Sequence, residues 1–208
     1  MDQMLEKKKR GRPFDNRKME LLISTAKRLF SENGFERTTI DSIAEESGVT
    51  KMTIYNHFKS KEELFGATIT NRIKKEFAFD IETLDPRNPS DGLIKIASRF
   101  ILLLRKEEVL GTYRTMFSSA LTHPKLCLEF YQKGPLEVHQ QVAKYLQQCS
   151  KEGSLKITNL DISTSQFLSL FLGLDHIRCM LGLKKPTKKD DEQLILKNVD
   201  FFIQASRN

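Results

Sequence analysis

Apolar residues follow the helical period along nearly the whole chain. Leu22, Ala26, Leu29 and Phe30, for example, recur three or four positions apart, as on one buried face of a helix. Glycine and proline are scarce, at 10 and 6 of 208 residues, and no long stretch alternates apolar and polar positions. This pattern predicts an all-α protein.

Glycines, prolines and capping residues divide the predicted helices into two groups. The first group is short and covers residues 15–33, 38–47, 50–58 and 60–83, with capping boxes expected at Thr38-x-x-Asp41 and Ser60-x-x-Glu63. The prolines at 86 and 89 then break the chain. Longer, more apolar helices follow over 93–104, 112–121, 124–132, 136–151, 161–183 and 194–203.

The segment TTIDSIAEESGVTKMTIYNHFKSKEEL, residues 38–64, combines a sparse apolar pattern with many polar side chains. Ala44 would let two helices cross closely, Gly48 would permit a tight turn, and Ile54 would pack back against the first helix. Those three features are what a helix-turn-helix requires. The other interpretation is an ordinary helical hairpin with a solvated polar face.

If Ala44 and Ile54 face inward, the polar side chains of the second helix face outward. Lys suits guanine or phosphate, Asn suits adenine, and Thr suits a thymine methyl or a phosphate. A helix start with lysines would also attract phosphate. The predicted DNA contacts in this segment are Thr38, Thr39, Thr50, Lys51, Thr53, Tyr55, Asn56, His57, Lys59 and Lys61.

The same segment, with the Gly34-Phe35 pair before it, resembles the DNA-binding domain of the TetR family of bacterial transcriptional regulators. The matching positions are Gly34-Phe35, Thr38-Thr39, Ile43-Ala44, Gly48-Val49, Tyr55, His57-Phe58, Lys61 and Leu64. Asn56 departs from the family pattern, in which an aromatic residue is common, so the base preference cannot be carried over. The segments HPKLCLEFYQKGP and FLSLFLGL are similar to one broad TetR subfamily.

The resemblance implies a two-fold homodimer on a palindromic operator and a C-terminal domain that binds a small molecule. Ligand binding would move the helix that joins the two domains and release a repressor from DNA. The expected organisation is a basic arm (1–14), a three-helix helix-turn-helix domain (15–61), a connecting helix (62–83) and a larger helical effector-binding and dimerisation domain (84–208). A ligand-independent DNA-binding or chromosome-organising protein is the alternative.

The net charge of +7 is unevenly spread: five of the first twelve residues are Lys or Arg, in the segment KKKRGRP at residues 7–13. Beside a DNA-binding domain, Arg10-Gly11-Arg12-Pro13 is typical of an AT-hook-like arm whose arginines enter an A·T-rich minor groove. A solvated tail, an anionic membrane contact and a nuclear-localisation signal are the alternatives.

The apolar helices of the C-terminal part suggest both a ligand pocket and a dimer interface. Aromatic and methionine side chains suit a small apolar or aromatic effector, although most of them could simply be core. The candidate pocket residues are Phe100, Leu104, Met116, Phe117, Phe130, Phe167 and Phe171. The last two predicted helices carry more apolar surface than one subunit would bury, which favours a four-helix dimer interface over burial within a monomer.

No catalytic motif, cofactor motif or zinc-ligand spacing is present, so we expect neither an enzyme nor a metal site. His123 with Cys127 and His176 with Cys179 could each share a helix face, but unliganded side chains explain them as well. No apolar run reaches the roughly 18 residues of a membrane helix, and no secretory signal is visible. We therefore expect a cytoplasmic protein that does not bind membranes.

Overall fold

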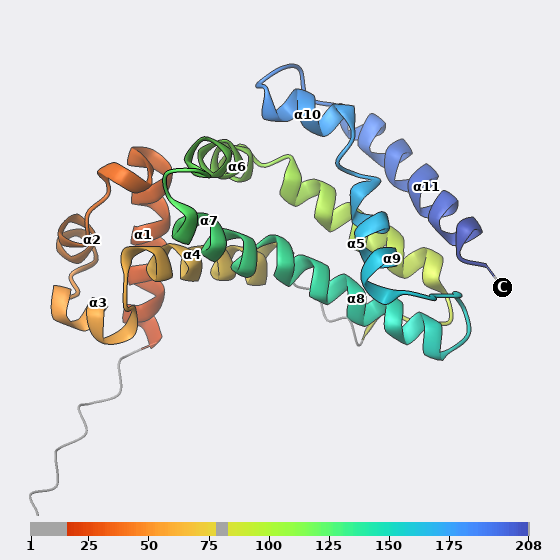
Figure 1. The fold of residues 1–208 in the computed structure, drawn as a ribbon, viewed down its shortest axis with the longest axis horizontal. Coiled ribbons are helices and arrows are strands. Elements are labelled where there is room, and N and C mark those ends of the chain that lie inside the picture. Colours follow the sequence, from red (N-terminus) through yellow and green to blue (C-terminus); the bar gives the residue numbers. More distant parts are fainter. Residues whose placement is uncertain (1–15, 78–82, 208) are drawn as a thin grey trace, which may run out of the picture.

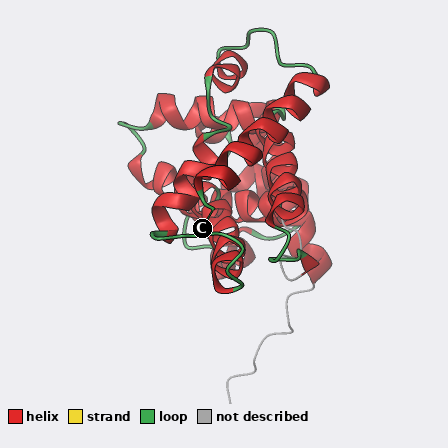
Figure 2. Ribbon diagram, turned by 90° about the vertical axis from the view of Figure 1, so that its right-hand side faces the viewer, coloured by secondary structure: helices red, strands yellow, loops and turns green. Residues whose placement is uncertain are grey.

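Figure 1 shows a computed structural model of the chain, in which residues 16–77 and 83–207 are described. The described residues form eleven α-helices and no strand (Figure 2), which confirms the all-α prediction. The predicted arm, with Arg10 and Arg12, lies outside the described residues. The helices are α1 (Asn16–Arg37), α2 (Ile40–Ser47), α3 (Lys51–His57), α4 (Lys61–Glu76), α5 (Pro89–Leu104), α6 (Glu107–Ser119), α7 (Pro124–Lys133), α8 (Pro135–Lys151), α9 (Leu160–Ser169), α10 (Leu174–Met180) and α11 (Lys188–Ala205).

Helices α1, α2 and α3 form a small lobe at one end of the molecule, on the left in Figure 1. Each helix contributes a fully buried apolar residue, namely Leu22, Ile43 and Ile54. The rings of Phe30 in α1 and Phe65 in α4 meet edge to face with 5.4 Å between their centroids, and this contact fixes the lobe on α4.

Glycines and hydroxyl caps set the ends of these short helices. Gly34 (φ 78°) interrupts α1 and Gly48 (φ 65°) ends α2, in backbone conformations that favour glycine. The capping box expected at Thr38 is wrong by one residue. Thr39 is the N-cap: its Oγ1 accepts from the Ser42 backbone N (3.0 Å), and the Ser42 Oγ accepts from the Thr39 N (3.2 Å).

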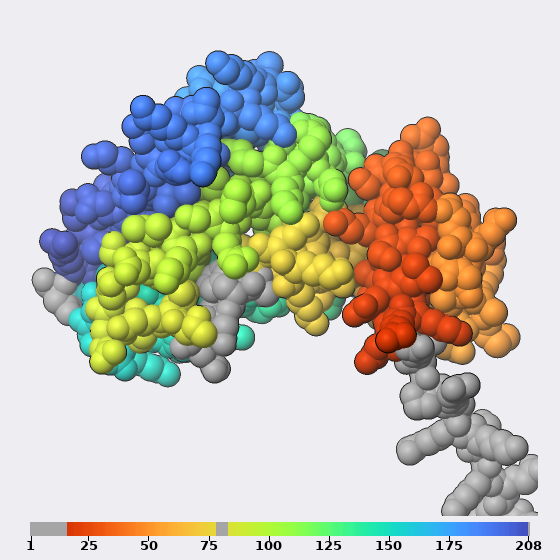
Figure 3. Space-filling model, turned by 180° about the vertical axis from the view of Figure 1, so that it is seen from behind, coloured from red at the N-terminus to blue at the C-terminus, as the bar shows by residue number. Residues whose placement is uncertain are grey.

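Helix α4 joins the small lobe to a larger helical body, which Figure 3 shows from behind. It packs against α1 on one side and α7 on another, while in the body α5 packs against α11, α8 against α9 and α6 against α10. Met116, Leu126 and Phe130 of α6 and α7 belong to the same apolar cluster as the small lobe. A displacement of α6 or α7 would therefore act directly on the lobe.

The single helix predicted over 161–183 is wrong, because the chain breaks between α9 and α10. The break leaves the Leu170 carbonyl without a helical partner, and the Nδ2 of Asn198 in α11 donates to it at 2.7 Å. Gly173 then serves as the N-cap of α10. A contact from a distant helix satisfies the interrupted backbone, and apolar periodicity alone could not reveal it.

Within the described parts of the chain, every helix is too short or too polar to cross a membrane.

Candidate DNA-binding surface and ligand cavity

Helix α3 is held to the lobe by one side and presents the other to solvent. Ile54 is fully buried and Val49, in the turn before α3, is 6% exposed. Thr50 caps the helix, because its Oγ1 accepts from the Thr53 backbone N at 3.2 Å. Buried anchors and a cap together fix the orientation of the outward face, as recognition of a DNA groove requires.

The outward face of α3 carries side chains suited to base edges and phosphates. Its exposed residues are Lys51, Met52, Tyr55, Asn56 and His57. The structure thus exposes four of the predicted contacts on α3 and leaves the fifth, Thr53, half-buried.

Sequence reasoning missed Met52, whose side chain is 75% exposed. Ile54, the other aliphatic residue of α3, is fully buried, so an aliphatic side chain as exposed as that of Met52 is unusual in this helix. Its spacing from Tyr55 and Asn56, three and four positions, places it on their face and could have revealed it.

Lys51, at the first turn of α3, forms an ion pair with Asp41 of α2, with 2.9 Å between Nζ and Oδ1. The hydrogen bond and the charge of Asp41 raise the pKa of the lysine. Both side chains are at least half exposed, so the pair contributes little to stability. The ammonium can therefore exchange Asp41 for a phosphate or a base at small cost.

The remaining predicted contacts divide into exposed and internal residues. Three of them are exposed: Thr39 at the start of α2, Thr50 at the start of α3, and Lys59 just after the end of α3. Thr38 is only 1% exposed, and its Oγ1 donates to the carbonyls of Leu29 (3.0 Å) and Gly34 (2.7 Å). This hydroxyl is directed into the lobe rather than toward DNA.

Lys61 also faces the lobe. Its Nζ donates to the carbonyls of Phe35 (2.8 Å) and Thr38 (3.0 Å) and lies 4.2 Å from the centroid of the Phe35 ring. The ammonium therefore ties the start of α4 to the α1–α2 connection. This is a structural role that its position in the motif did not indicate.

An apolar cavity of about 130 Å³ lies where α4 meets α5, α6, α7 and α8. Of the predicted pocket residues, Phe100, Leu104 and Phe130 line it. Tyr113 lines it as well, with its ring centroid 5.0 Å from that of Phe130, and burial raises the pKa of the phenol to about 12. Among the described residues that line the cavity, Arg72 of α4 has the one charged side chain.

The other predicted pocket residues lie elsewhere. Met116 lines a second cleft, described below. Phe117 is 69% exposed, so its prediction as a cavity residue is wrong. Phe167 and Phe171 are fully or almost fully buried in the core beneath α5 and α11 and do not line the cavity. Helical period predicts burial but cannot separate a cavity wall from a packed core.

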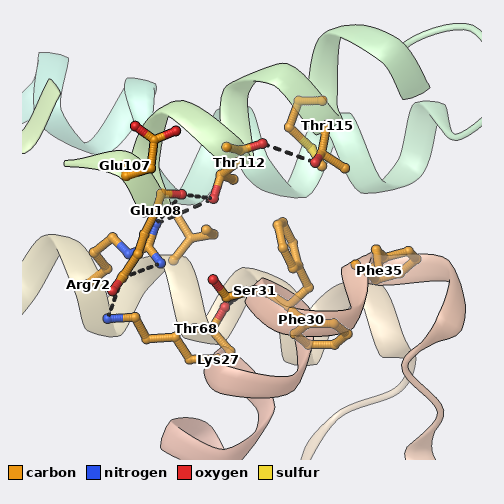
Figure 4. Close-up of a pocket in the computed structure, with 15 residues that line it drawn as sticks. Lys27, Phe30, Ser31, Phe35, Thr68, Arg72, Glu107, Glu108, Thr112 and Thr115 are labelled. Carbon is orange, nitrogen blue, oxygen red and sulfur yellow. Dashed lines mark hydrogen bonds and ion pairs between the residues drawn. The ribbon is translucent and has the colours of Figure 1, made fainter. Parts of the chain in front are cut away.

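The second cleft, of about 350 Å³, opens between the small lobe and the body and is lined by α1, α4 and α6 (Figure 4). Ion pairs cross it. The Nζ of Lys27 lies 3.2 Å from Glu108 Oε2, and the same carboxylate oxygen lies 3.4 Å from the Nη2 of Arg72. Glu108 of α6 thereby touches both α1 and α4.

Large apolar side chains remain exposed on the last helices of the single chain. They are Ile162 on α9, Leu172, Leu174, Ile177, Leu181 and Leu183 on and around α10, and Leu196 and Phe201 on α11. Large exposed apolar side chains gathered on neighbouring stretches of a chain favour a protein interface.

The histidine and cysteine pairs do not assemble into a site. His123 Nε2 lies 2.9 Å from Glu36 Oε1, while the Cys127 thiol donates to the Met116 carbonyl. Cys179 is buried, as is Cys149, where burial raises the pKa of the thiol. In the described part of the chain, no three His, Cys, Asp or Glu residues are grouped closely enough to hold a metal ion.

Known proteins match both parts of the chain. Residues 22–68 match the family model of bacterial regulatory proteins of the TetR family, and residues 91–207 match the C-terminal domain of AefR-like transcriptional repressors. The uncharacterized HTH-type transcriptional regulator YhgD of Bacillus subtilis is 27% identical over 155 residues, or 74% of this chain and 81% of YhgD. The biofilm operon negative transcriptional regulator IcaR of Staphylococcus epidermidis is 31% identical over 80 residues, or 38% of this chain and 43% of IcaR.

Solved structures share the fold. The flavonoid-responsive regulator FrrA is 28% identical and superposes with a TM-score of 0.73 over 93% of this chain and 98% of its own. A TetR transcriptional regulator from Agrobacterium tumefaciens reaches a TM-score of 0.76 at 20% identity, over 93% of this chain and 95% of its own. With one family model matching more than half of the sequence, this chain belongs to the TetR family of transcriptional regulators, proteins that bind DNA and are not enzymes.

Proposed function

We propose that the protein is a cytoplasmic repressor that binds a palindromic operator as a homodimer and is released by a small-molecule ligand. The observation that carries this proposal is the fixed outward face of α3, on which Lys51, Asn56 and their neighbours surround a buried anchor, Ile54. A rigid helix with exposed donors, acceptors and one apolar side chain fits the width of a major groove.

Each exposed side chain of α3 has a role suited to its chemistry. Asn56 pairs with adenine, Lys51 reaches guanine or a phosphate, and Met52 packs on a thymine methyl. Tyr55 and His57 brace the helix against the groove wall. Thr39, Thr50, Thr53 and Lys59 contact phosphates, whereas Thr38 and Lys61 act inside the lobe.

The arm supplies a second kind of contact. Arg10 and Arg12 enter the minor groove beside the site that α3 reads. Replacing both with Ala should lower the slope of log Kd against log salt by up to about two units, because each lost phosphate neutralisation removes about 0.9. An unchanged slope would exclude the arm from the interface.

The dimer forms through the exposed apolar residues of the last helices. Leu174 and Ile177 of α10, Leu181 just after it, and Leu196 and Phe201 of α11 are apolar side chains that a single subunit leaves exposed to water. Two copies related by a two-fold axis would cover this surface with its own equivalent. The two α3 helices would then face successive major grooves.

Release requires the ligand to favour a spread arrangement of the two lobes by a coupling of about 1–3 kcal/mol. The apolar cavity touches α4, which carries the lobe, and α7, which packs on α4. A ligand that enlarges this cavity would shift α4. The similar structure of FrrA, named as a flavonoid-responsive regulator, supports a small-molecule effector.

Ligand-independent DNA binding is the second candidate. The nucleoid occlusion factor SlmA of Vibrio cholerae is 29% identical over 122 residues, which cover 49% of this chain and 61% of SlmA. The basic arm would suit such a role as well as it suits a repressor.

Selection of bound sequences from random duplex DNA tests the proposal. The purified protein, at near-physiological salt, should recover an inverted repeat whose half-sites lie about 10 base pairs, or a multiple of that, apart. Recovery of A·T-rich sequence without symmetry would favour the chromosome-organising alternative. Recovery of no sequence would contradict DNA reading by α3.

A further inference from the structure

Arg72 is a buried cation that stands between the apolar cavity and the interlobe cleft. The residue is 7% exposed and lines both spaces; Figure 4 shows it in the cleft. It belongs to α4, the helix that carries the DNA-binding lobe. An arginine is almost never buried to this extent unless an anion pairs with it.

The partners of Arg72 inside the protein are distant and incomplete. Its Nη1 lies 3.4 Å from both the Glu108 carbonyl and the Thr112 Oγ1, and its Nη2 lies 3.4 Å from Glu108 Oε2. Charge-assisted hydrogen bonds are normally about 2.7–2.9 Å long. The Nε is buried and has no acceptor among the described residues. The guanidinium therefore retains unused capacity for an anion.

The ion pairs around Arg72 leave a positive charge uncompensated. Lys27, Arg72 and Lys106 provide three cations, while Glu76 and Glu108 provide two carboxylates. Glu108 is divided between two of these cations, and its oxygen lies closer to Lys27 (3.2 Å) than to Arg72 (3.4 Å). One further anion would balance the cluster.

We propose that the effector is an apolar organic acid whose carboxylate pairs with Arg72 while its apolar part fills the adjoining cavity. This inference rests on the proposed function and specifies its ligand class. A carboxylate matches the planar guanidinium fork, which the present contacts do not fill. The cavity of about 130 Å³ is close to the 150 Å³ or so that holds one benzene ring, so the apolar part is about one ring or a six-carbon chain.

The same geometry links the ligand to the DNA-binding lobe. A carboxylate on Arg72 would replace Glu108, the residue through which α6 also holds Lys27 of α1. Glu108 would then pair with Lys27 alone, and the contact of α6 with α1 in the lobe changes. The ligand and Glu108 therefore compete for one cation, and the outcome of that competition sets the position of the lobe.

The test compares acids with matched neutral probes on the full chain. Benzoate and hexanoate, with benzyl alcohol and hexan-1-ol as isosteric controls, are titrated calorimetrically at pH 7. The acids should bind at least tenfold more tightly than the alcohols. Equal binding of acid and alcohol, or binding of neither acid, would overturn the inference.

Variants separate competition from a merely structural role. Arg72→Gln should abolish the preference for acids. Glu108→Gln should tighten acid binding about three- to tenfold, because the competing carboxylate is gone, and this readout remains if the Arg72 variant does not fold. Glu192→Gln, an exposed carboxylate of α11 that is paired with Lys188 and is not among the residues lining the cavity or the cleft, is the matched control and should leave acid binding unchanged. A Glu108 variant that binds acids like the wild type would refute the competition.

DNA binding by the same preparations distinguishes the two proposals. If the protein binds its operator and a neutral ligand releases it, the proposed function stands and only the inference of an acidic effector is refuted. A protein that binds the acids but no DNA would contradict the proposed function instead.

Discussion

Replacing Lys61 with Met should destabilise the DNA-binding lobe without removing a DNA contact. The ammonium donates to the carbonyls of Phe35 and Thr38 at 2.8 and 3.0 Å, with a longer contact to Glu36 at 3.5 Å. It also lies over the Phe35 ring. Met keeps the length and apolar stem of the side chain and removes only the charge and the donors.

The expected loss follows from these contacts. A hydrogen bond from a charged donor contributes about 1.5–3 kcal/mol net, and an exposed cation–π contact about 0.5–1 kcal/mol. Because Lys61 is half-buried, water that solvates the vacated carbonyls would offset part of the stabilisation lost with its two short hydrogen bonds. The free energy of unfolding should therefore fall by about 2–4 kcal/mol, nearer the lower value.

Urea unfolding of the wild type and of Lys61→Met measures this change in the free energy of unfolding. Both are unfolded at the same protein concentration, because the stability of a dimer depends on concentration. Lys59→Met, two residues earlier and exposed, is the matched control. It should unfold like the wild type and lower the salt slope of DNA binding by about one. A Lys61 variant with wild-type stability and a reduced salt slope would refute the structural role of Lys61.

Gly48→Ala should cost about 1–2 kcal/mol of stability in urea unfolding, because a Cβ at φ 65° meets no atom within 4 Å and backbone strain is the whole effect. Gly92→Ala should cost more, since its Cβ would overlap the hydroxyl and two ring carbons of the buried Tyr145. Burial lowers the pKa of His176 below 6.5, so the unfolded chain binds the proton first. Stability should fall as pH drops below about 6.5, and less so in His176→Gln, as urea midpoints would show. Phe201→Asp should shift the sedimenting species from dimer to monomer, whereas an unchanged dimer would exclude this part of α11 from the interface.

The parts of the fold that depend on local chemistry could be predicted from the sequence. Glycine at position 48 permits the positive φ of the turn, the Thr50 side-chain oxygen can cap the third helix, and the apolar Ile54 side chain packs inward. None of these three features depends on the rest of the chain. These constraints act within a few residues. They therefore determine the helix-turn-helix and the outward face of α3 without knowledge of the C-terminal body.

The features that depend on contacts between distant parts of the chain could not be predicted from the sequence. Thr38 and Lys61 have the residue types of phosphate contacts, but carbonyls of α1 and of the α1–α2 connection hold them inside the lobe. Phe117 and Phe171 belong to equally apolar stretches, yet one is exposed and the other is core. Arg72 carries no sequence signal, because only the packing of α4 against α6 reveals how deeply it is buried.

Base selection by the wild type and by Asn56→Ala is the most direct measurement of whether α3 reads DNA from both halves of a dimer. The account predicts that the variant loses its preference at one base pair, and that the same position changes in both half-sites. The loss should be about 1–3 kcal/mol of discrimination per half-site. An inverted repeat with unaltered base preference, or a change in only one half, would contradict the reading of DNA by two symmetry-related α3 helices.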